Sequence, residues 1–429
     1  MSTTVTLPVK QAFEKAAKDW QAGAHDQVIA TCRAIVKAAP QHVDALNLLG
    51  LALYFTGAHL EAQDSLKRAL SVVRRADILN NLALVQRALK QQNDALESFS
   101  QAISLKPDYA EAHANLGRLL RQSGNRGGAL KHLIRAVELN WQQPRAHSDL
   151  ASIYLARDDV ENACRHFEAH FIQALPQIKL AASPSATAHD AEEADEKPKV
   201  SKPELFAAAL PAMKKLLDDA GIQFFLGDGT ALGCVRDGDF ISFDKDIDIG
   251  VWDSVPRERI TALLDESDDF WIEEKRDPRY ADILICGCYR DTVAIDIFFY
   301  KREKDYVWHG LRHADHEVRW RQTPFDLTSV EFRGAHYLIP SPVERYLIEL
   351  YEDWRTPDPN YCPYVTGNIV DGLPLMAKCY ALKELQSALG GGKREKALNI
   401  AKRLLGRLKA HAPAPELEAG LTAFIANNG

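Results

Sequence analysis

The sequence has few cysteines and no long apolar segment, and both absences narrow the classes of protein that it could encode. Seven cysteines occur in 429 residues without a Cys-x-x-Cys pair, so we expect neither a zinc ribbon nor a disulfide framework. Its apolar runs are far shorter than the roughly 20 residues that span a bilayer. The first 20 residues also lack the apolar core of a signal peptide. We therefore expect a cytoplasmic protein without a membrane span.

Basic residues are scarce in the middle of the chain. Residues 181–372 contain 22 Lys and Arg but 38 Asp and Glu, whereas the segments on either side are weakly basic. Because a phosphate backbone attracts surfaces rich in Lys and Arg, nucleic acid is not an expected partner. An acidic segment of this kind is better suited to bind divalent cations.

The first 175 residues repeat with a period of 33 or 34. Small residues recur at three positions of the unit, apart from His170 in the last unit, and Leu or Phe recurs at a fourth. These positions hold Gly50, Ala83, Gly117 and Ala151; Ala62, Ala95, Ala129 and Ala163; Ala69, Ala102 and Ala136; and Leu66, Phe99, Leu133 and Phe167. Small residues let two helices approach closely, and the larger ones fill the groove between units. A degenerate first unit is expected over residues 9–42.

This pattern resembles the tetratricopeptide repeat (TPR), a helix–turn–helix unit of 34 residues. The resemblance implies an α-solenoid over residues 1–178 whose concave groove holds a peptide or a partner protein. A spacer or a dimerisation arm is the alternative. Asn47, Asn81 and Asn115 recur on the first helix of successive units, where they could bond a bound backbone or serve within the array.

The rest of the chain divides into a linker, a mixed α/β domain and a helical tail. Residues 179–203 are rich in Ala, Ser, Pro and acidic residues and predict a flexible linker. A catalytic domain is expected over 204–372 and a helical C-terminal appendage over 373–429. Apolar alternation predicts strands over 222–226, 246–252, 282–289 and 293–300. Helical spacing predicts helices over 203–220, 229–236, 255–266 and 342–353.

A glycine-rich turn opens the segment that carries the candidate chemistry. Gly229, Thr230 and Gly233 lie between a predicted strand and a predicted helix. Backbone N–H groups at such a helix start, with the Thr hydroxyl, can bind a phosphate. A glycine turn capped by Thr is the structural alternative. Arg236 could add a charged contact to the phosphate or pair with the acidic strand that follows.

A row of carboxylates follows the turn. Asp244, Asp246 and Asp248 alternate with other residues, so on a strand they share one face. Carboxylates about 4 Å apart repel by ~1 kcal/mol in water and ~4 kcal/mol at an effective dielectric of 20, which favours a cation between them over a solvated edge strand. Oxygen ligands favour Mg²⁺ or Mn²⁺. Asp296, inside the apolar run VAIDIFFY, adds a third ligand if its strand pairs with that of Asp246; an Arg or amide partner is the alternative.

The order of these elements resembles the polymerase-β-like nucleotidyltransferase superfamily, and more closely its LicD and fukutin-related family. That family has a G-T-L-L-G-x-x-R-x-G stretch followed by a W-D-D-D-I-D-I strand. Here the two read GTALGCVRDG at 229–238 and FDKDIDI at 243–249. Lys245 replaces the family's middle acid, at a position that points away from the metal face. The stretch YVWHG at 306–310 and residues 340–357 also match, so the resemblance covers roughly 204–360.

The resemblance implies transfer of a phospho-group, of the phosphocholine or phospho-alditol type, from a CDP-linked donor to a hydroxyl of a glycan or glycoprotein that the TPR groove recruits. Asp246, Asp248 and Asp296 would carry catalysis and bind two Mg²⁺ ions, with Asp244 a further ligand or a supporting residue. The donor phosphate would contact the residues of the glycine turn, namely Gly229, Thr230, Gly233 and Arg236. Two alternatives are nucleotidyl transfer from an NTP to a protein or small molecule, and a TPR scaffold with a non-catalytic nucleotide-binding domain.

Three histidines cluster in the segment HGLRHADH at 309–316. A structural zinc site would need a fourth ligand, and the segment supplies no other sulfur or nitrogen ligand. We therefore expect these histidines to form hydrogen bonds in a loop or to contact the substrate.

Overall fold

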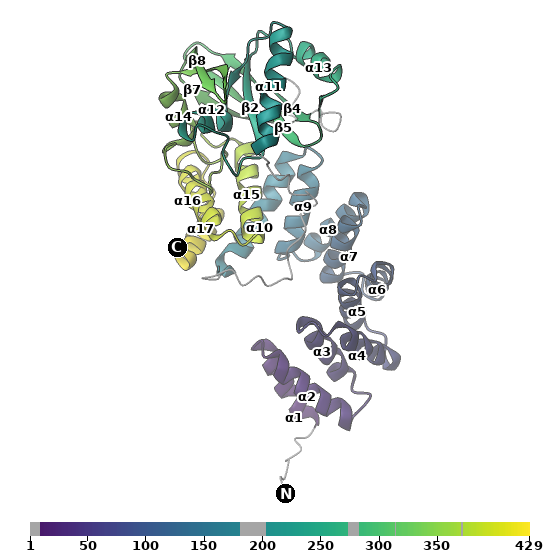
Figure 1. Ribbon diagram of the computed structural model, residues 1–429. Coiled ribbons are helices and arrows are strands. Elements are labelled where there is room, and N and C mark those ends of the chain that lie inside the picture. The colour runs from purple at the N-terminus through teal and green to yellow at the C-terminus, as the bar shows by residue number, and fades with distance from the viewer. Residues whose placement is uncertain (1–8, 181–202, 273–282, 314, 370–371) are drawn as a thin grey trace. The chain divides into compact units, whose positions relative to one another are not determined.

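The computed structural model describes residues 9–180, 203–272, 283–313, 315–369 and 372–429 (Figure 1). Almost all of the predicted linker lies outside the described residues. The chain forms two units, one ending at Ile153 and the other beginning at Tyr154. Within the described residues, no helix has the length and apolar character needed to cross a membrane.

The first unit is a solenoid of paired helices, as the repeat pattern predicts. From α1 to α8, each helix packs against the next one in the chain, and the expected degenerate unit over 9–42 contains the first pair. The helices are α1 (Val9–Gln21), α2 (His25–Ala38), α3 (Val43–Phe55), α4 (His59–Val72), α5 (Ala76–Ala88), α6 (Gln92–Leu105), α7 (Ala110–Gln122), α8 (Arg126–Leu139) and α9 (Pro144–Leu155). The last of these, α9, spans the boundary between the two units.

Small residues have the packing role that the repeat pattern predicts. A Cβ atom on Gly50 would lie 2.6 Å from Cγ of Leu66, and one on Gly117 would lie 2.7 Å from Cγ of Leu133. Inside each of these two units, which lie two repeats apart, the same position of the first helix is therefore in close contact with the same position of the second helix. Any larger residue there would push the two helices of the unit apart.

The turn inside each unit has the same backbone conformation. Gly23, Gly57, Lys90, Gly124 and Asp158 all have φ between 60° and 84°, and they follow one another at 33 or 34 residues. This left-handed conformation ends the first helix of each unit and suits glycine best. The turn of the first unit matches those of the later units, which explains how a segment with few consensus residues still forms a repeat.

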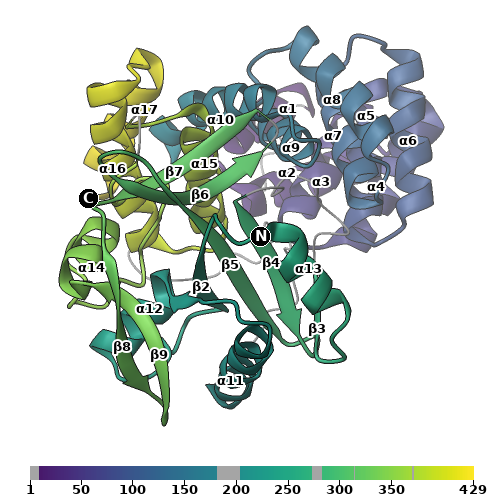
Figure 2. The same ribbon diagram turned by 90° about the horizontal axis from the view of Figure 1, so that it is seen from above.

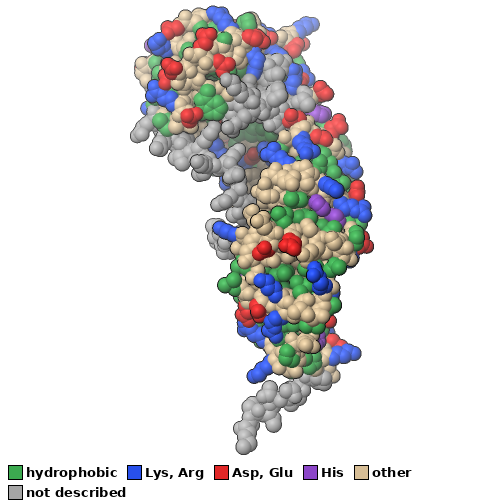
Figure 3. Space-filling view, turned by 90° about the vertical axis from the view of Figure 1, so that its right-hand side faces the viewer, with side chains coloured by type: hydrophobic (Ala, Val, Ile, Leu, Met, Phe, Trp, Pro, Cys, Tyr) green, Lys and Arg blue, Asp and Glu red, His purple; other side chains and the backbone are tan. Residues whose placement is uncertain are grey.

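The recurrent asparagines link neighbouring units. Nδ2 of Asn81 donates to Oδ1 of Asn47 at 2.9 Å, and Nδ2 of Asn115 donates to Oδ1 of Asn80 at 3.0 Å. Two roles were considered for these asparagines, binding of a ligand backbone and bonds within the array. In the structure these amide groups form bonds within the array. On the face in Figure 3, basic and acidic side chains are interspersed along the array and form no large patch of one sign.

The second unit contains a mixed sheet with the strand order β1-β2-β5-β4-β3, in which β6 lies between β5 and β7 (Figure 2). Strands β2 and β5 are parallel, and the other neighbouring pairs of this sheet are antiparallel among the described residues. A separate hairpin joins β8 to β9. The strands are β1 (Phe225–Leu226), β2 (Asp246–Trp252), β3 (Phe270–Ile272), β4 (Leu284–Tyr289), β5 (Val293–Arg302), β6 (Val307–His313), β7 (His316–Gln322), β8 (Asp326–Phe332) and β9 (Ala335–Ser341).

Helices surround this sheet and continue into the tail. All four predicted helices of the domain form, and residues 373–429 are helical as expected. Ile247, Ile249, Ile295 and Ile297 of the two central parallel strands are fully buried, so they form the core under the helices. The helices are α10 (Val160–Ala174), α11 (Pro203–Asp219), α12 (Asp228–Arg236), α13 (Arg257–Asp265), α14 (Val343–Tyr351), α15 (Leu375–Gly390), α16 (Arg394–His411) and α17 (Pro415–Asn428), with the short 3₁₀ helix η1 (Leu175–Gln177).

The sequence pattern predicted the central strands and missed the outer ones. Strand β2 has its predicted bounds, and β5 begins at its predicted residue. The predicted strand over 222–226 was too long, because only Phe225 and Leu226 pair with β2. Strand β3 and strands β6 to β9 were not predicted. In β8, mostly exposed or half-buried side chains follow one another, so the strand shows no apolar alternation.

Candidate functional site

Parallel pairing of β2 and β5 brings the predicted acids together. Asp248 lies opposite Asp296 in the register, so the pairing on which the role of Asp296 depended is confirmed. Oxygen atoms of Asp244, Asp246 and Asp248 all lie within 4.8 Å of one another. Asp244 precedes β2 and still belongs to this group of three, whereas Asp296 lines the same cavity from the neighbouring strand. We call these four residues the acid cluster.

Burial and mutual repulsion make the acid cluster unfavourable when all its members are charged. Burial, followed by the charge of Asp246, raises the pKa of Asp244 to about 7. Burial also raises the pKa of Asp246 and of Asp248, and the pKa of Asp248 is raised further by the carboxylates around it. A divalent cation removes this penalty, since it replaces the lost hydration with oxygen ligation. The donor set therefore fits Mg²⁺ or Mn²⁺.

The glycine turn holds Asp248. The N–H of Gly229 donates to Oδ2 of Asp248 at 2.9 Å, and the N–H of Asp248 donates to Oγ1 of Thr230 at 2.8 Å. A Cβ on Gly229 would lie 2.6 Å from Oδ2 of Asp244, so only glycine leaves room for the carboxylates. Thr230 is 2% exposed and does not line the cavity. In this structure the N–H of Gly229 and the hydroxyl of Thr230 are both bonded to Asp248, and Gly229 also lines the cavity, so the phosphate contact stays a prediction.

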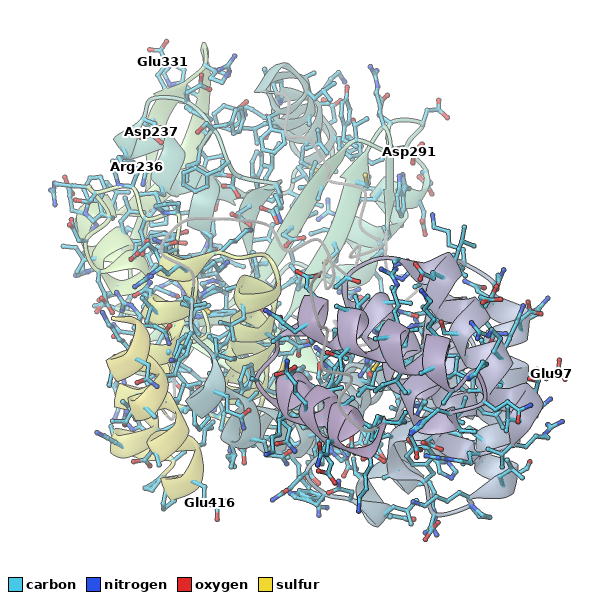
Figure 4. The ribbon with its side chains drawn as sticks, turned by 90° about the horizontal axis from the view of Figure 1, so that it is seen from below. Glu97, Arg236, Asp237, Asp291, Glu331 and Glu416 are labelled. Carbon is cyan, nitrogen blue, oxygen red and sulfur yellow. The ribbon has the colours of Figure 1, made fainter. Side chains whose placement is uncertain are left out.

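The present contacts of Gly233 and Arg236 are of two kinds, and their predicted phosphate contact stays a prediction. A Cβ on Gly233 would lie 2.6 Å from the carbonyl oxygen of Asp239, so this glycine allows the chain after α12 to pack against the helix, away from the cavity. Arg236 lines the cavity, but its Nε and Nη2 donate to the carboxylate of Asp237, both at 2.8 Å. Figure 4 labels this pair at the end of α12. The partner of Arg236 is its neighbour in sequence and not the acidic strand.

Asp228 is a site residue that the sequence reasoning missed. Tyr300 donates its hydroxyl to Oδ2 of Asp228 at 3.1 Å, and the N–H of Asp228 donates to the hydroxyl of Tyr346 at 3.0 Å. The two tyrosine hydroxyls lie 2.7 Å apart, which closes a ring of hydrogen bonds. Nε2 of His309 lies 3.0 Å from Oδ1 of the same carboxylate. This network holds Asp228 at a φ of 35°, beside the acid cluster.

The position of His309 can be compared with the prediction for the three histidines. It lies on β6 and not in a loop, it is 1% exposed, and it stacks on the ring of Tyr300 at 4.5 Å. Its contact with Asp228 makes it a hydrogen-bonding residue, as expected. Two features of the sequence could have suggested this network: Asp228 directly precedes Gly229, and His309 lies in the YVWHG stretch that matches the family.

The acid cluster forms one wall of a cavity of roughly 400 Å³. Most of the remaining lining comes from β5, β6, β7, α14 and the segment after α14, and we call it the aromatic wall. Half of its residues are aromatic, and two are further acids. These lining residues are Phe298, Leu311, Trp320, Leu350, Tyr351, Asp353, Trp354, Thr356, Asp358, Tyr361, Pro363 and Tyr364. The cavity therefore combines carboxylates with large amphipathic rings, as in sites that bind a small polar molecule.

Two parts of the chain match known families. Residues 221–342 match the family model described as "LicD/FKTN/FKRP, nucleotidyltransferase domain", and residues 83–124 match a TPR repeat model. The chain joins a TPR array to a LicD/fukutin-type domain.

Among curated proteins, ribitol-5-phosphate transferase FKTN of Mus musculus is 26% identical over 161 residues, and that of Homo sapiens is 25% identical over 161 residues. The match covers 35% of this chain and 35% of each relative, about a third of their length.

The array has its own relatives. Tetratricopeptide repeat protein 36 of Mus musculus is 44% identical over 80 residues, which is 17% of this chain and 42% of that protein. The match to the crystal structure of MamA has 21% sequence identity and a TM-score of 0.33, and it covers 37% of this chain and 93% of the MamA chain. A thermophilic TPR protein of Thermus thermophilus, TTC0263, is 21% identical, over 39% of this chain and 92% of that one, with a TM-score of 0.36. These scores carry no information about function.

Proposed function

We propose that the LicD/fukutin-type domain is a Mg²⁺-dependent phosphotransferase with a polymerase-β-like nucleotidyltransferase fold. It moves a phospho-group, of the phosphocholine or phospho-alditol type, from a CDP-linked donor to a hydroxyl of a glycan or glycoprotein. The observation that carries the proposal is the convergence of Asp244, Asp246 and Asp248 beside Asp296 in one cavity. The activity for which the curated relatives are named, ribitol-5-phosphate transfer, supports the same reaction class.

The acid cluster would hold two cations: Asp246 and Asp248 would be their main ligands, with Asp244 on one side and Asp296 from β5 adding oxygens. Bound there, such ions would supply charge neutralisation for the donor phosphates and the leaving group and would lower the pKa of the acceptor hydroxyl. Gly229 and Thr230 fix the carboxylate and the backbone of Asp248, so the ligands are positioned before the donor arrives.

Asp296 acts on the acceptor. The acceptor oxygen forms a bond to the transferred phosphorus, the bond from that phosphorus to the CMP oxygen breaks, and the acceptor proton passes to Asp296. Half-buried among apolar neighbours, Asp296 lies where few waters compete for that proton. Asp228 lines the same cavity, where its carboxyl group is held by His309 and Tyr300.

The aromatic wall suits a sugar-like acceptor. Ring faces pack against the C–H groups of a sugar, and the carboxylates of Asp353 and Asp358 accept hydrogen bonds from its hydroxyls. The TPR array supplies a protein-binding scaffold. We therefore propose a glycoprotein or assembly-bound glycan as the acceptor, recruited by the array.

A donor screen tests the proposal. CDP-choline, CDP-ribitol, CDP-glycerol and the four NTPs are incubated with the full chain and Mg²⁺, and the released products are identified. CMP release from a CDP-linked donor, lost in Asp246→Asn and kept in the exposed control Asp326→Asn, is the expected result. Pyrophosphate release from an NTP would favour nucleotidyl transfer instead. Mg²⁺-independent turnover, or none with any donor, would contradict the proposal.

A further inference from the structure

The tail helix α16 contacts the segment that forms the aromatic wall. This region lies outside the family match, which ends at residue 342, so the match assigns no role to either part. Nε of Arg407 donates to the carbonyl oxygen of Val365 at 2.9 Å, Nη2 to that of Gly367 at 2.6 Å and Nη1 to that of Gly372 at 2.8 Å. One guanidinium thus satisfies three backbone carbonyls of the same segment.

Two further side chains of α16 hold the same segment. Nη1 of Arg403 donates to both carboxylate oxygens of Glu352, at 2.9 and 3.0 Å. Nδ2 of Asn399 donates to the carbonyl oxygen of Asn360 at 3.1 Å. Asn399, Arg403 and Arg407 are spaced by four, so they share one face of the helix. That face fixes the segment at residues 352, 360, 365 and 367.

The side chains between these fixed points line the cavity. Asp353, Trp354, Asp358, Tyr361 and Tyr364 all belong to the aromatic wall of the cavity that the acid cluster also lines. They lie on a stretch without a helix or a long strand. Its backbone is bonded to α14 and β7 near its end, where the N–H of Asn368 donates to Glu349 and the N–H of Arg321 donates to Asn368, and α16 adds the contacts described above. The shape of the stretch therefore depends in part on α16.

The tail also contacts α10 and the residues that follow it. Helices α15 and α17 pack beside α10, as Figures 1 and 2 show. Nζ of Lys378 lies 2.5 Å from Oε1 of Glu168 on α10. Asn428 donates to the carbonyl oxygen of Ile178 at 2.9 Å and accepts from the N–H of Leu180 at 2.6 Å. The tail thus links the helix that ends the repeats to the wall of the cavity.

We propose that Arg407, with Arg403 and Asn399, is a positioning residue: it holds the aromatic wall at the distance from the acid cluster that the substrate requires. The kinetic part of this proposal rests on the proposed phosphotransferase function. The structural part does not, because it concerns the backbone of residues 352–369 alone.

Hydrogen–deuterium exchange on the full chain tests the structural part. The amides of Val365, Thr366 and Asn368 are hydrogen-bonded and report on the segment. We expect Arg407→Met to raise their exchange about tenfold or more, with β2 and β5 unchanged. Arg407→Lys, which keeps the charge but not the three-way geometry, should restore protection in part. The matched control is Lys409→Met on the exposed face of α16.

Two results would overturn the proposal: unchanged exchange at these amides, or an equal rise in β2 and β5, which indicates general destabilisation. With an active donor, Arg407→Met should raise KM about tenfold or more and change kcat less, with partial rescue by Arg407→Lys. Equal loss of kcat in both variants would contradict a positioning role. Absence of turnover in the unmodified protein would contradict the proposed function and leave the exchange result standing.

Discussion

Replacement of Gly229 by alanine tests whether the glycine turn exists to position the acid cluster. The new Cβ would lie 2.6 Å from Oδ2 of Asp244 and 2.9 Å from Oδ2 of Asp248. Ordinary van der Waals contact begins at 3.4 Å, so the Asp244 oxygen must move by about 0.8 Å. The carboxylate of Asp248 cannot move independently, because it is also bonded to the N–H of Gly229.

This displacement predicts a large functional effect and a moderate effect on stability. Overpacking by one methyl group costs about 1–3 kcal/mol of folding free energy. Disturbing a group that orients a metal ligand lowers metal affinity about 10–100-fold. A misplacement approaching 1 Å in the reacting groups can reduce turnover about 100-fold.

Calorimetric titration with Mg²⁺ and the donor assay measure the two effects. The matched control is Gly127→Ala on α8, where a new Cβ meets no atom within 4 Å and should leave both readings unchanged. Wild-type Mg²⁺ affinity and turnover in Gly229→Ala would refute the reasoning, since the carboxylates would then tolerate a contact that the geometry forbids.

Three further predictions concern stability. Lys90→Gly should stabilise the array by about 0.5–1 kcal/mol, because glycine adopts the positive φ of this turn without the cost that Lys incurs; a lower melting temperature would contradict it. Asp228→Asn should destabilise the second unit by about 1–3 kcal/mol, because the amide NH₂ group would then face a buried donor, either the Tyr300 hydroxyl or the His309 ring. Denaturant unfolding, with Asp326→Asn as the control variant, measures this change. The pKa of Asp244 is raised to about 7 in the fold, so the folded state binds more protons than the unfolded state between about pH 4 and pH 7, and this carboxyl makes stability fall as pH rises. In EDTA, Asp244→Asn should therefore gain stability over wild type across that range, and an identical pH profile for the two proteins would count against the raised pKa.

The solenoid could be predicted closely from the sequence because its determinants are local and repeated. Gly50 and Gly117 recur at one position of the unit, and the structure gives both the same contact. The conformation of the turns was less visible, since Lys90 and Asp158 adopt the φ that glycine has in the other units. There the geometry of the array determines the backbone and overrides the preference of the residue.

The acids of the site were predictable, and their surroundings were not. Alternation on β2 and an acid in an apolar strand sufficed to pair Asp248 with Asp296. The network around Asp228 joins α12, β5, β6 and α14, which are up to 118 residues apart in sequence. The aromatic wall depends likewise on α16, whose contacts no local pattern reveals. Such long-range contacts follow from tertiary packing, which a single sequence does not display.

Anomalous diffraction from crystals grown with Mn²⁺ tests the central claim most directly. The account predicts strong peaks within ligand distance of Asp246 and Asp248, with Asp244 and Asp296 completing the coordination. Crystals that show Mn²⁺ elsewhere, with no peak beside these four carboxylates, would contradict it.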